Sequence, residues 1–359
     1  MSIFVTKTFL PPKEEYQKYL DQIWESHWLT NNGPILQKLE AELKDFLNYQ
    51  NFLFVSNGTI AIQLAIKALD LKGEIITTPY SYCATTTSIL WENCKPVFAD
   101  INEHDLNINP DLIEDKITDK TEAIIATHVY GNPCDVDKIE AIAKKYSLKV
   151  IYDAAHAFGA SLRGKSVLNY GDVSTCSFHA TKVFHTIEGG SVMCKDDGLF
   201  EKIKLYRSFG HINDDYYTQG INGKNSEFHA AMGLANLPYL SGNIIKRKRI
   251  SELYDSLLDS NKLIKPETKE ADFEYNYAYY PIVLENAEIT NQVIDELKAQ
   301  NIHPRRYFYP SLNRLDYVHS QDICPVSESV VQRVLSLPLY PDLAEEDVKR
   351  ICQIINKTL

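Results

Sequence analysis

The sequence lacks the long apolar runs, the excess of basic residues and the paired cysteines that mark several large classes of protein. Apolar residues make up 44% of the 359 positions, but no uninterrupted run of them approaches the roughly 18 residues that a membrane-spanning helix needs. Lys and Arg number 37 against 48 Asp and Glu, which gives a formal net charge of -11. We therefore expect no membrane and no nucleic acid as partner, because an acidic surface repels polyanions and anionic lipid.

The cysteines are odd in number and scattered, and no two of them form a Cys-x-x-Cys pair. This usage is poor material for a zinc site and is typical of free, mostly buried thiols in a reducing compartment. Residues 1–16 also lack the basic and apolar regions of a secretory signal. We therefore expect a cytoplasmic location. The cysteines are Cys83, Cys94, Cys134, Cys176, Cys194, Cys324 and Cys352.

Two common phosphate-binding motifs are missing or out of context. No G-x-G-x-x-G follows a predicted strand, which argues against a dinucleotide-dependent oxidoreductase. Residues 159–166 match the P-loop pattern G-x-x-x-x-G-K-S, but a true P-loop lies directly between a strand and a helix. Here residues 154–158 intervene upstream, and residues 167–172 break any helix downstream. We interpret the segment as an exposed turn between short strands, which argues against nucleotide hydrolysis.

Up to about residue 225 the chain alternates short apolar strands with longer helical segments. Several strand candidates are continuous Ile, Val, Ala and Phe runs, as expected where helices cover both faces of a sheet. Strand-helix-strand repetition implies right-handed crossovers and a mainly parallel, doubly wound α/β sheet of seven strands. The predicted strands are residues 52–56, 74–78, 96–99, 123–129, 149–153, 173–178 and 191–194, and the predicted helices are 59–70, 81–93, 111–117, 135–146 and 200–208.

The pattern changes after residue 225. A long helical run over 226–260 is followed by two Tyr-rich strand candidates around 278–284 and by helices near 290–301 and 345–356. We predict a large domain over residues 1–240, with an N-terminal arm, and a smaller α+β domain over residues 241–359.

Ligands of an open parallel sheet bind at the carboxyl ends of its strands, so polar residues there are candidates for a site. The first predicted strand runs into Gly58 and Thr59, where backbone N–H groups at a helix N-terminus would bind an anion. The alternative is that Ser56 or Asn57 only caps that helix. The fifth strand ends at Asp153, a poorly solvated carboxylate that either pairs with a cation or caps the next turn.

Lys182 follows the sixth predicted strand in a loop that is rich in aromatic residues and bounded by glycines. Most lysines are solvated surface groups. An amine in a partly apolar pocket, however, gives up its proton more readily and becomes a nucleophile toward carbonyl groups. Lys182 is therefore a candidate nucleophile, with a surface role as the alternative.

Five short motifs in a fixed order resemble the DegT/DnrJ/EryC1/StrS family. The resemblance covers nearly the whole chain, including the opening residues 28–34. It implies the fold type I architecture of pyridoxal 5′-phosphate (PLP)-dependent transferases and an aminotransferase that acts on sugar nucleotides. The motifs are Asn57-Gly58-Thr59, Asp153-Ala154-Ala155-His156-Ala157, Ser177-Phe178-His179-Ala180-Thr181-Lys182, Glu188-Gly189-Gly190 and Gly220-Ile221-Asn222-Gly223-Lys224.

The resemblance assigns roles toward PLP to individual residues. Lys182 would bind the cofactor's aldehyde covalently, and Asp153 would pair with the protonated pyridine nitrogen, which keeps the ring an electron sink. His156 matches the position beside the phenolic oxygen, where many relatives have Gln. Tyr82 matches the aromatic residue that stacks on the ring, with core packing as the alternative.

The cofactor's phosphate has its own set of residues in the family. Gly58, Thr59 and Ser177 match the phosphate-binding cup. Asn222 matches the residue that reaches the phosphate from a neighbouring subunit, so the resemblance implies a homodimer with shared active sites. The alternative for Asn222 is a plain turn residue.

The resemblance also implies a reaction. L-Glutamate is the expected amino donor and a nucleotide-linked keto-sugar the expected acceptor. The residues after Lys182, together with residues 6–12, are most similar to the branch that aminates C4 of dTDP-4-dehydro-6-deoxy-D-glucose for O-antigen biosynthesis. A 3-keto-sugar aminotransferase remains the alternative, as does a non-catalytic relative that binds nucleotide sugars. A PLP-dependent sugar dehydratase is disfavoured, because there His replaces the lysine.

Substrate contacts are expected at the two ends of the chain. Trp28 and Thr30 belong to the opening segment of the resemblance. Arg305 or Arg306 lies beside Tyr307-Phe308-Tyr309, and such a basic and aromatic stretch could hold a diphosphate and stack a thymine. Residues 246–249 are also basic, but a solvated helix face explains them equally well.

Overall fold

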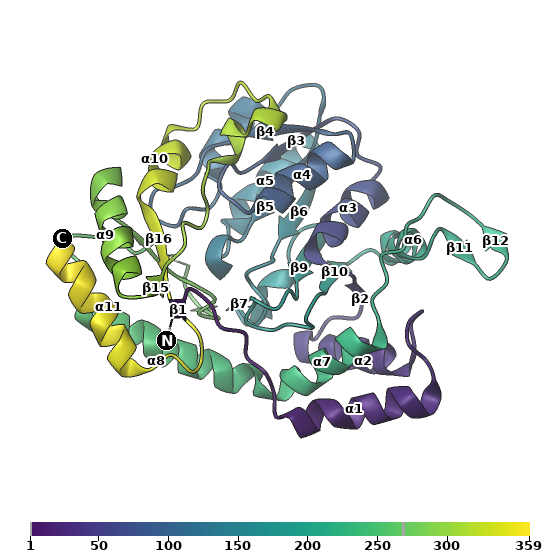
Figure 1. The fold of residues 1–359 in the computed structure, drawn as a ribbon. Coiled ribbons are helices and arrows are strands. Elements are labelled where there is room, and N and C mark those ends of the chain that lie inside the picture. Colours follow the sequence, from purple (N-terminus) through teal and green to yellow (C-terminus); the bar gives the residue numbers. More distant parts are fainter. Residues whose placement is uncertain (1, 268–269) are drawn as a thin grey trace.

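The computed structural model describes residues 2–267 and 270–359, and its centre is a seven-stranded sheet (Figure 1). The strand order is β2-β10-β9-β6-β5-β3-β4. β10 runs antiparallel to both of its neighbours, while the other neighbouring pairs are parallel. The predicted mainly parallel sheet is thus confirmed. Its strands are β2 (Phe52–Val55), β3 (Glu74–Thr77), β4 (Lys95–Phe98), β5 (Thr121–Thr127), β6 (Lys149–Asp153), β9 (Val173–Ser177) and β10 (Gly190–Cys194).

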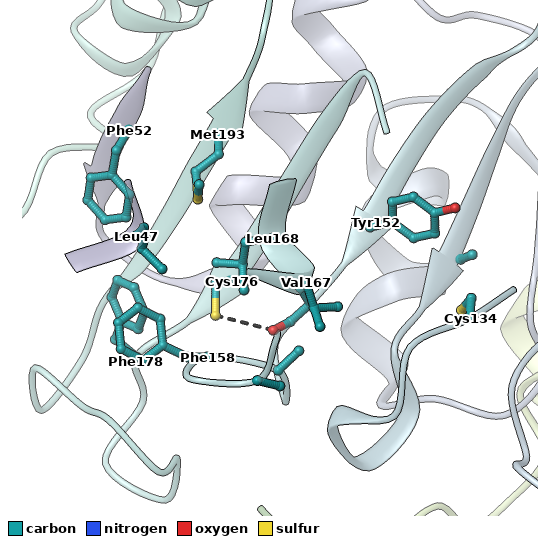
Figure 2. Close-up of a cluster of buried hydrophobic side chains, with 14 of the residues drawn as sticks. Leu47, Phe52, Cys134, Tyr152, Phe158, Val167, Leu168, Cys176, Phe178 and Met193 are labelled. Atoms are coloured by element: carbon teal, nitrogen blue, oxygen red, sulfur yellow. Dashed lines mark hydrogen bonds between the residues drawn. The ribbon is translucent and has the colours of Figure 1, made fainter. Parts of the chain in front are cut away.

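Helices cover both faces of this sheet, which explains the unbroken apolar runs of its strands. Successive strand residues point to opposite faces, so Phe52 and Phe54 enter one hydrophobic core while Leu53 and Val55 enter the other. Figure 2 shows part of the first core, where Phe158 lies against Phe178 from β9's loop at a ring distance of 5.2 Å. The first core includes residues of α2 (Pro34–Leu47), α5 (Val136–Tyr146) and α7 (Glu227–Asn236); the second includes residues of α3 (Gly58–Ala68), α4 (Cys83–Trp91) and α6 (Asp197–Arg207).

Two helices that the sequence analysis did not predict precede the sheet. They are α1 (Lys13–Ser26) and α2, and both pack against α7. Before them, β1 (Ile3–Phe4) pairs in parallel with β15 (Ile302–His303), so the first residues lie against the last third of the chain. The predicted N-terminal arm therefore links the two halves of the molecule.

The predicted helix over 226–260 is interrupted, which corrects the sequence analysis. α7 ends at Asn236, a 3-10 turn covers Leu237–Tyr239, and α8 runs over Leu240–Leu257. Pro238 lies in the turn, where its missing N–H cannot continue the α-helical ladder. The predicted helix over 111–117 is likewise two 3-10 turns, Pro110–Leu112 and Glu114–Lys116.

The last third of the chain forms its own small sheet and core. β14 (Tyr280–Val283) pairs antiparallel with β16 (Val334–Leu337), so one strand stands where the sequence suggested two. The surrounding helices are α9 (Ala287–Ala299), α10 (Pro325–Arg333) and α11 (Glu345–Thr358), of which α10 was not predicted. β14, β16, α8, α9 and α11 contribute to one hydrophobic core, whereas Val330 and Val331 of α10 belong to another. The division into domains at residue 240 stays a prediction.

The P-loop-like segment is a short hairpin, as expected. β7 (Ser161–Leu162) and β8 (Lys165–Ser166) pair around Arg163 and Gly164, which both have positive φ angles. β13 (Phe273–Glu274) extends this small sheet on the other side of β7. A second hairpin, β11 (His211–Ile212) with β12 (Asp215–Tyr216), projects from the body of the molecule (Figure 1).

The described residues contain no helix that is both long and apolar enough to span a bilayer. All seven cysteines are free, and only Cys83 among them is partly accessible. Within residues 2–267 and 270–359, no cluster of His, Cys, Asp and Glu has the arrangement of a metal site.

Candidate active site

A cavity of about 530 Å³ opens at the sheet edge where β2, β3, β6 and β9 end. The loops that follow these strands form one side, and Tyr279, Arg305, Tyr307 and Phe308 from the last third of the chain form the other. Many of the predicted site residues meet here. Those that line the cavity are Gly58, Thr59, Tyr82, Asp153, His156, Ser177, Lys182 and Arg305; those that do not are Trp28, Thr30, Asn222, Arg306 and Tyr309.

Asp153 is the last residue of β6, and its carboxylate is almost fully buried. One oxygen accepts a hydrogen bond from the Thr85 hydroxyl at 2.7 Å, and the other accepts from the Ala155 N–H at 3.1 Å. Burial raises the pKa of Asp153, while these two donors and the Lys182 amine act in the opposite direction. A carboxylate in this position is stabilised by a cation that enters the cavity.

His156 is held as a neutral ring beside this carboxylate. Burial, and to a lesser extent the charge of Lys182, lowers the pKa of His156 well below its usual value. Its Nδ1 accepts a hydrogen bond from the Tyr130 N–H at 3.3 Å. The ring also stacks on Phe308 at 5.3 Å. Because a neutral imidazole whose Nδ1 accepts carries its proton on Nε2, His156 can donate one hydrogen bond from Nε2.

Lys182 lies in the same cavity as Asp153, as the prediction of a shared ligand requires. Its backbone N–H bonds the His179 carbonyl in the turn after β9. The ammonium group donates to the Tyr279 hydroxyl at 3.4 Å. The amine is therefore directed by a residue from the other half of the chain.

The N-terminus of α3 forms the base of the cavity. Asn57 caps the helix by accepting the Ile60 N–H at 2.9 Å, so the capping alternative holds and the helix begins at Gly58. Capping leaves other first-turn N–H groups free to bind an anion. A Cβ atom at Gly58 would lie 3.0 Å from the Cβ of Ser177, so glycine lets α3 and the end of β9 approach each other closely.

The mouth of the cavity carries an exposed tyrosine and an arginine. Tyr82, the residue before α4, is 59% exposed and lines the cavity, so core packing does not explain it. The Arg305 guanidinium lies 5.1 Å from the centre of the Tyr307 ring, a cation–π arrangement. Arg305 is thus available to an anionic ligand in the cavity.

Arg306 and Tyr309 point to a different surface. The Arg306 guanidinium bonds Asn291 on α9 and lies over the Tyr309 ring. Of the two arginines that the sequence left open, only Arg305 lines the cavity.

The remaining predicted residues lie on exposed loops. Trp28 and Thr30 sit between α1 and α2, where the Trp28 indole N–H donates to the Thr30 carbonyl at 2.5 Å. Asn222 is exposed and pairs with Ser208 at the foot of the β11–β12 hairpin. A role for these three residues in substrate or cofactor binding stays a prediction.

Sequence reasoning missed several residues that line or support the cavity. Thr85 does not line the cavity but donates to Asp153, and it was overlooked although it stands one helical turn after Tyr82. Tyr279 comes from a segment far from the strand ends, and only the Tyr-rich composition near residues 275–280 gave a signal. Tyr307 and Phe308 belong to the basic and aromatic stretch noted in the sequence, but they were given no role of their own.

The arrangement fits PLP and the chemistry of a transaminase. The cavity combines a neutral histidine, an amine and a helix N-terminus suited to a phosphate with a buried carboxylate that a bound cation would stabilise. The fold and the site together define a PLP-dependent α/β transferase. The chain matches the DegT/DnrJ/EryC1/StrS aminotransferase family over residues 12–356 and belongs to that family. The predicted cofactor and enzyme class are therefore confirmed.

Relatives and solved structures agree with this placement. The chain is 42% identical over 361 residues to dTDP-4-amino-4,6-dideoxy-D-glucose transaminase of Shigella dysenteriae, covering 99% of this chain and 98% of the relative. It is 40% identical to the protein of the same name from Escherichia coli, with the same coverage. DesI, solved in the presence of its TDP-sugar product, superimposes with a TM-score of 0.93 at 29% identity, covering 99% of this chain and 92% of that one.

Proposed function

We propose that this enzyme transfers an amino group from L-glutamate to C4 of dTDP-4-dehydro-6-deoxy-D-glucose, giving dTDP-4-amino-4,6-dideoxy-D-glucose. The observation that carries the proposal is the full-length identity of 40–42% to two transaminases named for this product. The cavity adds support, since it combines groups for PLP with Arg305 at its mouth. The product would serve the synthesis of O-antigen or another cell-surface polysaccharide in the cytoplasm.

Each residue of the cavity has a separate role in the proposed transamination. Asp153 would hold a positive charge on the pyridine nitrogen of PLP, His156 would donate from Nε2 to the phenolic oxygen, and Ser177 with the start of α3 would hold the phosphate. Bound PLP supplies an electron sink for the charge left on the donor's α-carbon. The Lys182 amine would take the proton from the α-carbon of the donor and, in the second half of the reaction, would deliver a proton to C4 of the sugar.

The substrate is tested with a panel of nucleotide sugars. Purified enzyme is incubated with L-glutamate and either 3-keto or 4-keto sugars, each linked to dTDP or UDP, and the products are identified by NMR. We expect amination at C4 of the dTDP-linked 4-keto sugar and formation of 2-oxoglutarate. Replacing L-glutamate by L-alanine or L-glutamine checks the donor. Amination at C3, or a strong preference for another donor, would contradict the proposal.

A second candidate function has a specific observation in its favour. The chain is 31% identical, over 98% of its length, to UDP-N-acetyl-3-dehydro-alpha-D-glucosamine 3-aminotransferase of Acidithiobacillus ferrooxidans. The lower identity places this activity second. The UDP-linked 3-keto sugar in the panel decides between the two.

Arg305 is proposed to bind the diphosphate of the sugar nucleotide. Arg305→Gln removes the charge at the cavity, so we expect KM for the sugar nucleotide to rise about tenfold or more, since hydrogen bonds between charged groups are strong. Arg306→Gln is the matched control, because Arg306 bonds Asn291 outside the cavity. Steady-state kinetics with varied sugar nucleotide measure both. An equal rise in KM for the two variants would argue against the assignment.

A homodimer with shared active sites is part of the proposal. Asn222 does not line the cavity of its own chain, and it lies at the foot of a projecting hairpin. Such a placement suits a residue that acts in the site of a second copy. Sedimentation velocity on the purified protein tests the assembly.

A further inference from the structure

Tyr279 is the residue in closest polar contact with the Lys182 side chain. Its hydroxyl lies 3.4 Å from the Lys182 amine, and its ring centre lies 6.0 Å from the same nitrogen. Tyr279 lines the cavity but is only 9% exposed, so its hydroxyl is directed inward. The sequence analysis gave this residue no role, and the reaction described above does not use it.

The ring of Tyr279 is fixed by aromatic neighbours from both halves of the chain. It meets the edge of His156 at 5.1 Å and an interplanar angle of 73°. It also contacts Tyr130 at 5.5 Å and Tyr307 at 5.6 Å. A side chain with three ring contacts loses little further freedom when its hydroxyl binds a partner.

The backbone of Tyr279 is equally well anchored. The Tyr275 hydroxyl donates to the Tyr279 carbonyl at 3.2 Å and to the Tyr130 carbonyl at 3.0 Å. The amide of Asn276 donates to the carbonyls of His156 and Phe158, at 2.7 and 2.9 Å. The segment 275–279 is thereby bonded to the loop that follows β6, which places the hydroxyl at a constant position relative to the cavity.

We propose that Tyr279 is a positioning residue that holds the Lys182 amine at the reaction centre whenever that amine is not bound to the cofactor. A phenol can accept a hydrogen bond from an ammonium group and can donate one to a neutral amine. The same contact therefore serves Lys182 before and after it takes up the proton. Without it, the four-carbon side chain is free to sample other rotamers. This inference deepens the proposed function and rests on it.

The first test uses the apoprotein and needs no turnover. Apoprotein is mixed with PLP, and capture of the aldehyde is followed by stopped-flow absorbance. In Tyr279→Phe we expect the rate constant of capture to fall about tenfold, because the amine is less often in position. Tyr309→Phe makes the same change at a tyrosine outside the cavity and should leave the rate unchanged. Phenylalanine keeps the ring contacts, and thermal unfolding of both variants verifies the fold.

The second test separates positioning of the amine from binding of the donor. With L-glutamate deuterated at C2, we expect Tyr279→Phe to lower kcat about tenfold, to raise the kinetic isotope effect on kcat and to leave KM for glutamate within twofold. A purely structural role would lower stability or change KM without raising the isotope effect. Capture and isotope effect equal to wild type would overturn the inference. Wild-type turnover on the sugar panel is measured separately, so failure of the proposed function remains distinguishable.

Discussion

The Asp153 carboxylate depends on a hydrogen bond from Thr85, a residue that does not line the cavity. The Thr85 hydroxyl donates to the Asp153 carboxylate, and the Ser81 hydroxyl lies 2.8 Å from that of Thr85. The Thr127 hydroxyl continues the chain by donating to Ser81 at 3.1 Å. Because burial raises the pKa of Asp153, each donor that reaches its carboxylate helps to keep it ionised.

Removing that donor predicts weaker cofactor binding. Thr85→Val keeps the shape of the side chain but leaves one oxygen of Asp153 without its hydrogen bond. Hydrogen bonds to charged groups contribute about 1.5–3 kcal/mol, so we expect the dissociation constant of PLP to rise roughly ten- to hundredfold. Equilibrium titration of apoprotein with PLP measures it.

The matched control for Thr85→Val is Ser81→Ala, one step further from the carboxylate in the same chain of hydroxyls. Its effect on PLP affinity should be clearly smaller. If both variants weakened binding equally, the direct bond from Thr85 would not be the cause.

Residues that follow a strand could be predicted from the sequence more fully than residues brought in from elsewhere. Asp153 and Lys182 stand directly after buried apolar runs, and the rule that sites form at strand ends places them together. Tyr279, 97 residues after Lys182, reaches the same cavity without any signal of its own, and Arg305 was predicted only as one of two neighbouring arginines. Their position depends on how the last third packs on the sheet, which no local pattern encodes.

Among the secondary-structure elements, the strands of the sheet were predicted better than the helices. The seven strands were predictable because burial on both faces leaves mainly apolar residues in several of the runs, such as residues 52–55 and 123–126. α1 and α2 were missed, although α2 shows a regular apolar face with Leu36, Leu39 and Leu43 all buried. The helix that was predicted over 226–260 is interrupted at Pro238, because proline has no N–H for the helical hydrogen bond even where the apolar pattern is continuous.

The start of α2 depends on one buried glutamate from α7. Glu227 is fully buried, and its two oxygens accept the N–H groups of Ile35 and Leu36 at 2.7 and 3.1 Å. These are first-turn donors without a partner inside the helix, and a carboxylate also suits the positive end of the helix dipole. Glu227 therefore fixes α2 and the preceding loop, which carries Trp28 and Thr30, to α7.

Glu227→Gln is predicted to destabilise the protein by about 1–3 kcal/mol, because one buried N–H loses its acceptor and faces an amide donor instead. The midpoint of urea unfolding, followed by circular dichroism, measures the loss. Glu42→Gln serves as control on the same helix, since its partner Lys38 is 3.9 Å away and both are exposed. An exposed pair of this kind contributes about 0–1 kcal/mol. Equal losses in the two variants would contradict the role of Glu227.

At the scale of the whole molecule, burial of neutral histidines links stability to pH. His128 is fully buried, stacks on Tyr152 at 4.5 Å and accepts the Cys134 N–H at Nδ1. Burial lowers its pKa to about 3. The unfolded chain binds this proton near pH 6.5 and the folded chain does not. The stability contributed by His128 is therefore present above pH 6.5 and is lost as the pH falls from there toward 3.

This linkage predicts a loss of about 1.4 kcal/mol for each pH unit below about 6.5. In His128→Asn the amide oxygen can still accept the Cys134 N–H, and the titrating group is gone. The variant is expected to be less stable than wild type at pH 7.5, because the ring contact with Tyr152 is lost. That difference should narrow by about 1.4 kcal/mol at pH 5.5. Urea unfolding at the two pH values measures it, and a constant difference would refute the linkage.

The assembly of the whole enzyme is open to a test by complementation. In a homodimer with shared sites, a Lys182→Ala chain still offers an intact Asn222, and an Asn222→Ala chain still offers an intact Lys182. Mixed dimers would then contain one site built only from unchanged residues and one site with both changes. We expect each variant alone to be strongly impaired, and the mixture, after dissociation and reassociation, to regain up to about a quarter of wild-type activity. The ceiling is this low because random pairing makes half of the dimers mixed and only one of their two sites is intact. If Asn222 acted within its own chain, no mixed dimer would hold an intact site, and mixing would restore nothing.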